Sequence, residues 1–145
     1  MDTRFHHRRS ALFNVLGSLR VDTLLVTRPA NWFYLTGFTG ESGALIVSKN
    51  GTTLITDGRF MVQAKAEASG VRLRRQEGAL LESVGEALRG LRARRVGFDP
   101  AHMTVSELQG ARKASGRQRK WVSLKCPTAS IRRLASPVPA TNREK

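Results

Sequence analysis

The sequence has a single cysteine, no long apolar run and few acidic residues. Cys126 has no second cysteine to pair with, which excludes an intrachain disulfide framework and a cysteine-rich zinc site and is compatible with a reducing compartment. No apolar run approaches the roughly 20 residues needed to cross a bilayer. The basic start, residues 1–10, precedes an apolar stretch that Asn14, Gly17 and Arg20 interrupt, so we read no secretory signal. We expect a cytoplasmic protein with no membrane partner.

The shortage of acidic residues gives the chain a strong positive charge. Eleven Asp and Glu stand against 25 Lys and Arg, for a formal net charge of +14. The excess is uneven, because residues 1–100 hold fifteen basic and nine acidic side chains, whereas residues 101–145 hold ten and two. A basic field attracts nucleic acids and other polyanions without specifying a fold. A polyanion-binding module is therefore one function that the sequence leaves open.

Length and apolar content bound the domain organisation. A chain of 145 residues, 40% of them hydrophobic, predicts one domain with a core large enough to fold without disulfides or a structural metal. From Cys126 onward, prolines and serines replace large apolar residues, so little remains to be buried. We expect a domain over residues 1–124 and an irregular basic tail over residues 125–145.

Hydrophobic periodicity predicts helices and strands that alternate along the chain. Apolar residues spaced by three and four positions predict helices over residues 4–19, 29–35, 59–69, 79–91 and 104–115. Short apolar, often β-branched runs predict strands over residues 23–27, 44–48, 52–56, 71–73, 95–98 and 121–124. This alternation, broken by one hairpin, is typical of an α/β fold with a mixed β-sheet of about five or six strands flanked by helices.

Local signals mark several element ends. Asn50-Gly51 tolerates the positive φ angles of a tight turn and predicts a hairpin between its flanking strands. Thr104 and Glu107 have the spacing of a capping box at the start of a helix. In the first helix, the apolar stripe leaves Arg8 and Arg9 outside it.

Two catalytic patterns are incomplete. Gly37, Gly40 and Gly43 resemble a phosphate-binding loop, but a predicted strand follows them where such a loop needs a helix, which favours turn and cap glycines. Ser42, in the sequence Gly-Glu-Ser-Gly, lies one residue short of a nucleophile elbow, and no histidine is suitably placed. The sequence predicts no catalytic residue.

The histidines do not form a metal-binding pattern. His6 and His7 are adjacent and would point about 100° apart on a helix, which favours two solvated side chains. Asp99 and His102 could share a metal, but a hydrolytic site needs three or more protein ligands, and helix-entry residues are the favoured interpretation. We predict no metal site in this chain.

Six arginines lie before and after the helix predicted over residues 79–91, at positions 72, 74, 75, 92, 94 and 95. Few aromatic residues accompany them and no recognised nucleic-acid motif is present, so a solvated basic face is the favoured interpretation and nucleic-acid binding is the alternative. Glu82 and Glu86, an i, i+4 pair on that helix, are predicted to face water.

One long pattern carries a resemblance to a known family. Residues 26–40 read VTRPANWFYLTGFTG, residues 42–47 read SGALIV, and residues 54–60 read LITDGRF. VGFD at residues 96–99 and HMT at residues 102–104 follow in the same order and at similar spacing. Together these segments resemble the N-terminal domain of the creatinase/prolidase/aminopeptidase P family, and the likeness covers about residues 10–115.

The resemblance implies a fold for this chain and separate roles for two domains. The fold would be the creatinase/prolidase N-terminal type, a ribonuclease H-like α/β domain. In such proteins a C-terminal "pita-bread" domain carries two Asp, one His and two Glu that bind two divalent ions, Mn, Co or Zn. We expect this chain to lack that catalytic domain. We therefore expect an accessory domain of an Xaa-Pro aminopeptidase or prolidase, without a cofactor of its own and not hydrolytic by itself.

The resemblance also implies partners and site residues. Such a domain packs against a catalytic domain, helps to form homo-oligomers, and lends side chains to the rim of a site for proline-containing peptides. By matching position, the candidates for this rim or for an interface are Tyr34, Phe38, Asp57 and Arg59. The structural alternative makes the two aromatic residues part of the core or of an interface, and makes Asp57 and Arg59 a turn-fixing pair.

The last part of the sequence departs from the family pattern. Residues 125–145 are broken by prolines and almost free of acid, where relatives continue into a charged linker helix. The abrupt change in charge predicts a truncation or frameshift near residues 116–125. Translating the downstream DNA in three frames tests this expectation, and finding no catalytic-domain coding sequence in any frame would contradict it.

Overall fold

The computed structural model describes residues 3–124, in which helices and strands alternate. The elements in chain order are α1 (Arg4–Leu16), β1 (Thr23–Val26), α2 (Pro29–Thr36), β2 (Ala44–Ser48), β3 (Gly51–Thr56), the 3-10 helix η1 (Gly58–Phe60), α3 (Met61–Glu67), β4 (Arg72–Arg75), α4 (Leu80–Gly90), β5 (Arg95–Phe98), the 3-10 helix η2 (Pro100–His102), α5 (Val105–Ser115) and β6 (Lys120–Ser123). No helix within this described part is long and apolar enough to cross a membrane. The tail expected over residues 125–145 lies outside the described residues.

Six strands form one mixed sheet in the order β4-β3-β2-β1-β5-β6, which confirms the predicted α/β class. β1 pairs antiparallel with β2 and parallel with β5, and β3 and β6 pair parallel with β4 and β5. Five strands therefore run in one direction, and only β2 is reversed. We call the edge where these five strands end the carboxyl edge, and the edge where they begin the amino edge.

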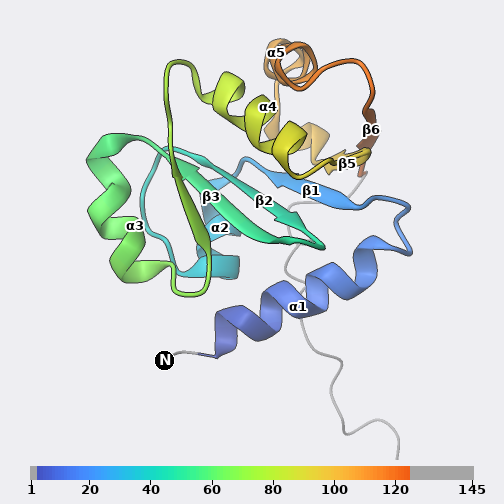
Figure 1. The fold of residues 1–145 in the computed structure, drawn as a ribbon. Helices are drawn as coiled ribbons and strands as arrows, with labels where there is room; N and C mark the ends of the chain where they lie inside the picture. The colour runs from blue at the N-terminus through green and yellow to red at the C-terminus, as the bar shows by residue number, and fades with distance from the viewer. Residues whose placement is uncertain (1–2, 125–145) are drawn as a thin grey trace, which may run out of the picture.

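Helices cover both faces of the sheet, as Figure 1 shows, with α1, α2 and α3 on one side and α4 and α5 on the other. Successive strand residues point to opposite faces, so Leu24 and Val26 pack in the first layer and Leu25 packs in the second. β1 and β2 are buried along their whole length. This explains their continuous apolar runs, because a central strand covered on both faces has no solvent side.

The β2–β3 hairpin differs in detail from the turn that the sequence predicts. The turn residues are Lys49 and Asn50, and Ser48 pairs with Gly51. Only Gly51 has a positive φ, 114°, whereas the prediction allowed for positive φ at both Asn50 and Gly51. A two-residue turn followed by a glycine of positive φ keeps the strand register without placing asparagine in the left-handed region.

The capping box predicted for α5 is confirmed. The Thr104 hydroxyl accepts a hydrogen bond from the Glu107 backbone N–H at 3.0 Å, and the Glu107 carboxylate accepts one from the Thr104 N–H at 2.9 Å. Two N–H groups of the first turn are thereby satisfied.

Arg9 is buried, although the helical pattern placed it outside the apolar stripe. Its guanidinium donates to the Leu35 carbonyl at 2.9 Å and the Ser69 carbonyl at 3.3 Å. Burial lowers the pKa of Arg9 below its ordinary value. The Leu35 carbonyl lies in the last turn of α2, where helix carbonyls lack backbone partners and carry partial negative charge, whereas the Ser69 carbonyl lies in the loop after α3. Arg9 therefore joins α1 to the end of α2 and to the loop after α3.

Candidate functional site

Two of the four nominated residues form an ion pair where β3 ends at the carboxyl edge. Asp57 precedes η1 and accepts from the Arg59 backbone N–H at 2.9 Å, so it caps that helix. The Arg59 guanidinium donates to both carboxylate oxygens of Asp57, at 3.1 and 2.9 Å. The hydrogen bond from the Arg59 side chain is the main cause that lowers the pKa of Asp57. Asp57 and Arg59 thus fix the turn, while the Arg59 side chain stays 76% exposed.

The two nominated aromatic residues lie in different surroundings. Phe38 is fully buried, with its ring 6.4 Å from Trp32 and 6.3 Å from Phe60 between centroids. Tyr34, in α2, is half-buried and lies under the Arg8 guanidinium, 4.0 Å from its ring centroid. Phe38 belongs to the core of this domain, whereas Tyr34 faces α1. A role for either residue at a substrate rim stays a prediction.

A polar network that the sequence analysis did not identify lies beside this turn. The Glu67 carboxylate accepts from the Thr39 backbone N–H at 3.0 Å and from the Thr39 hydroxyl at 2.9 and 2.8 Å. Gln63 donates to the Thr39 hydroxyl at 2.6 Å and to Glu67 at 3.1 Å. The network fixes the loop after α2 against α3. Thr39 falls in one of the resembling segments, but no local pattern joins it to Glu67, which lies 28 residues away in sequence.

We expect this network to make the domain less stable in acid. Burial raises the pKa of Glu67, but hydrogen bonds from Thr39 and Gln63 outweigh it, and the net pKa lies below its ordinary value of 4.5. A carboxyl whose pKa is depressed by folding stabilises the protein above its unfolded pKa, and that contribution disappears as pH falls through the folded pKa. Thermal unfolding followed between pH 6 and pH 3 should show a falling Tm, and Glu67→Gln should make this fall shallower. An unchanged profile in the variant would contradict the role of Glu67.

The glycine segment is a turn leading into a strand, as the sequence predicts. Gly37 ends α2 with a φ of 84° and donates to the Phe33 carbonyl. Gly43 has a φ of 155°, and a Cβ there would lie 2.4 Å from the Ile55 carbonyl oxygen. β2 begins directly after it, so these glycines open no helix and form no phosphate-binding loop.

The described residues offer no ligand set for the two-metal chemistry that the resemblance implies. Asp99 caps η2 by accepting from the Ala101 N–H at 2.9 Å, and the His102 carbonyl accepts from the Thr27 hydroxyl at 2.6 Å. His6 and His7 are exposed. Between residues 3 and 124, no group of three or more His, Cys, Asp and Glu side chains could hold a metal ion. The side chains of residues 3–124 therefore do not fit a binuclear centre.

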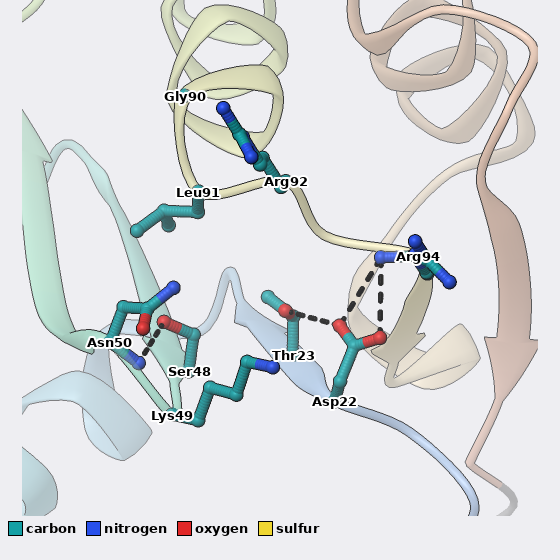
Figure 2. A pocket seen from close by; sticks show the side chains of 9 residues that line it. All are labelled: Asp22, Thr23, Ser48, Lys49, Asn50, Gly90, Leu91, Arg92 and Arg94. Atoms are coloured by element: carbon teal, nitrogen blue, oxygen red, sulfur yellow. Dashed lines mark hydrogen bonds between the residues drawn. The ribbon is translucent and has the colours of Figure 1, made fainter.

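The six predicted arginines do not form one cluster. Arg74 forms a 2.6 Å ion pair with Glu86, so Glu86 has a basic partner as well as solvent contact. Arg72 donates to the Asn50 carbonyl at the hairpin. Arg92 and Arg94 instead line a hollow of about 660 Å³ at the amino edge, which Figure 2 shows from close by. The predicted arginines therefore lie on more than one surface of the domain.

Comparisons with known proteins agree with this geometry. The family model described as the creatinase/prolidase N-terminal domain matches residues 8–134. The chain is 33% identical over 93 residues to the uncharacterized peptidase YqhT of Bacillus subtilis, a match that covers 64% of this chain and 26% of the relative. The chain therefore spans about a quarter of that curated relative.

Solved structures give the same fold. The N-terminal domain of the cytoplasmic peptidase PepQ from Mycobacterium tuberculosis is 26% identical with a TM-score of 0.77, and the match covers 88% of this chain and 97% of that one. The Xaa-Pro dipeptidase from Bacillus anthracis has a TM-score of 0.76 at 24% identity, over 82% of this chain and 34% of that chain, which shows the shared fold. The match from residue 8 to residue 134, together with the six-stranded sheet and its flanking helices, shows that this chain belongs to the creatinase/prolidase N-terminal domain family.

Proposed function

We propose that this chain acts as the N-terminal accessory domain of an Xaa-Pro peptidase of the aminopeptidase P or prolidase type, and that it is not hydrolytic by itself. The observation that carries the proposal is the match over 88% of this chain to a domain that begins a longer peptidase, PepQ. In this role the domain packs against a metal-dependent catalytic domain and takes part in a homo-oligomer. Static light scattering of the purified chain tests the oligomer.

The carboxyl edge is the part of the domain that we assign to the substrate rim. Asp57 holds Arg59 in one orientation through two side-chain hydrogen bonds, while most of the guanidinium surface stays in solvent. A fixed, exposed guanidinium suits a carboxylate, either of a peptide or of the catalytic domain. Tyr34 and Phe38 would then support this edge from α2 and the core.

A chimera tests the proposal. This domain replaces the third of the Bacillus anthracis dipeptidase that it matches, and hydrolysis of an Xaa-Pro dipeptide is measured with Mn²⁺. We expect the chimera to hydrolyse the dipeptide, and Arg59→Gln to raise KM about tenfold, the loss of one charge-assisted contact. Lys65→Gln, an exposed charge on α3, is the matched control and should leave KM unchanged.

Two results would contradict the proposal. A folded, metal-loaded chimera without hydrolysis would show that this domain cannot serve a catalytic partner. Metal-dependent release of the first residue by the chain alone would show that the domain is itself a hydrolase.

A further inference from the structure

Two arginines adopt a backbone conformation that favours glycine. Arg20 and Arg92 have φ angles of 60° and 54°, and they are the non-glycine residues of positive φ within residues 3–124. Each follows a helix end with the same hydrogen bonds. Arg92 donates to the Arg89 carbonyl and the next residue to Leu88, while Arg20 donates to Gly17 and its successor to Leu16. This is the Schellman arrangement, whose left-handed position is usually glycine. Backbone strain of this kind is concentrated at functional sites in proteins, and both arginine side chains are exposed.

Arg92 lines the hollow at the amino edge, and Arg20 lies in the neighbouring loop before β1. Figure 2 shows Lys49 reaching in from the hairpin and Arg92 and Arg94 in the loop after α4. Asp22 is the acidic residue of this hollow, but its carboxylate accepts hydrogen bonds from the backbone N–H groups of Arg94 and Arg95 and from the Thr23 hydroxyl. The Asp22 carboxylate is thus held by hydrogen bonds within the domain, and the basic side chains that line the hollow outnumber this one acidic side chain.

A second basic hollow continues the first along the same edge. Its volume is about 690 Å³, and its charged lining residues are all basic: Arg112, Lys113, Arg117, Arg119 and Lys120. The Lys120 backbone N–H donates to the Arg94 carbonyl at 2.7 Å, so the two hollows are adjacent. Burial lowers the pKa of Arg119, and the neighbouring Arg89 charge lowers it further.

The side chains that line the two hollows distinguish between polyanion partners. The exposed large apolar side chains among residues 3–124 are Phe13, Phe33, Val62 and Val105, and none lines either hollow. A protein interface needs an apolar core, whereas a phosphate backbone needs spaced cations only. Trp121, the aromatic residue that lines the second hollow, is buried, so neither hollow offers an exposed ring on which a base could stack. We propose that the amino edge binds the phosphodiester backbone of a nucleic acid without sequence preference, through Arg20, Lys49, Arg92, Arg94 and the second hollow.

Fluorescence anisotropy with a labelled 20-base-pair DNA duplex and the full chain tests this proposal. With about four phosphates contacted, Kd should rise about a hundredfold between 50 and 200 mM salt. The double variant Arg20→Gly and Arg92→Gly removes two charges while relieving the backbone strain, so it should fold at least as well as the parent. This double variant should raise the Kd for DNA about tenfold and lower the slope of log Kd against log salt concentration by about two.

The matched control removes two charges from other surfaces, Lys65→Gln on α3 and Arg75→Gln at the end of β4, and should change Kd less than twofold. Equal weakening by both double variants would overturn the proposal in favour of the overall charge, and poly-L-glutamate binding as tight as DNA binding would overturn it in favour of an acidic protein partner. A Kd that does not depend on salt would also overturn it. Because the chimera carries its test residues at the opposite edge, failure of either proposal leaves the other standing.

Discussion

Replacing Gly85 by valine is expected to destabilise the domain by about 3 kcal/mol, because it separates two packed helices. Gly85 lies in α4, and a Cβ built there would lie 2.4 Å from the carbonyl carbon and the Cβ of Ala114 in α5. Real Cβ atoms do not approach backbone so closely, so α5 must move away from α4. Urea unfolding followed by circular dichroism measures the loss as a lower midpoint.

Gly90→Ala is the control for this experiment, since Gly90 is the last residue of the same helix. A Cβ at Gly90 would have no atom within 4 Å, and alanine is a better helix former by up to about 1 kcal/mol. This variant should unfold at the midpoint of the parent or slightly above it. If Gly85→Val also unfolds at the urea midpoint of the parent, the close approach of α4 and α5 is refuted.

Trp32→Ala is expected to cost about 4 kcal/mol, because it truncates one of the largest fully buried side chains. Trp32 is 2% exposed, contacts Phe38, and donates from its indole Nε1 to the Gly40 carbonyl at 3.1 Å. The truncation leaves a cavity and an unpaired carbonyl in the loop that carries Thr39. Guanidinium unfolding followed by circular dichroism measures the loss without relying on the deleted fluorophore.

Trp32→Phe separates the two causes. Phenylalanine keeps most of the apolar contact and removes only the indole donor, which should cost about 1 to 2 kcal/mol. If Trp32→Phe were as damaging as Trp32→Ala, the hydrogen bond to Gly40, and not the packing of the ring, would dominate.

The fold was predictable because its signals are local. The continuous apolar runs of β1 and β2, the stop at Gly37 and the capping box of Thr104 each depend on a few neighbouring residues. The order of the strands confirms the class that the alternation predicts, a mixed sheet flanked by helices. Element ends shifted by a few residues where tertiary contacts decide them, as in β4, predicted over residues 71–73 and found over Arg72–Arg75.

The site was only partly predictable, because its contacts join distant segments. Asp57 and Arg59 were nominated from the family resemblance, and their alternative role as a turn-fixing pair could be predicted because they lie two residues apart. No local pattern marks the contact of Thr39 with Glu67, and none marks the Leu35 and Ser69 carbonyls that accept hydrogen bonds from Arg9. The helical pattern placed Arg9 outside the stripe because periodicity scores an arginine as polar, while its guanidinium can be buried wherever carbonyl groups gather.

The central position of β1 has a consequence for synthesis. Its antiparallel neighbour β2 begins at Ala44, directly after α2 and its loop, but its parallel neighbour β5 supplies Val96 opposite Thr23 only much later in the chain. At about 5 to 20 residues per second, the ribosome needs roughly 2 to 10 seconds to travel from the hairpin to β5. During that interval an apolar strand edge of the nascent chain is open, and we expect chaperone capture or misassembly to be most frequent there.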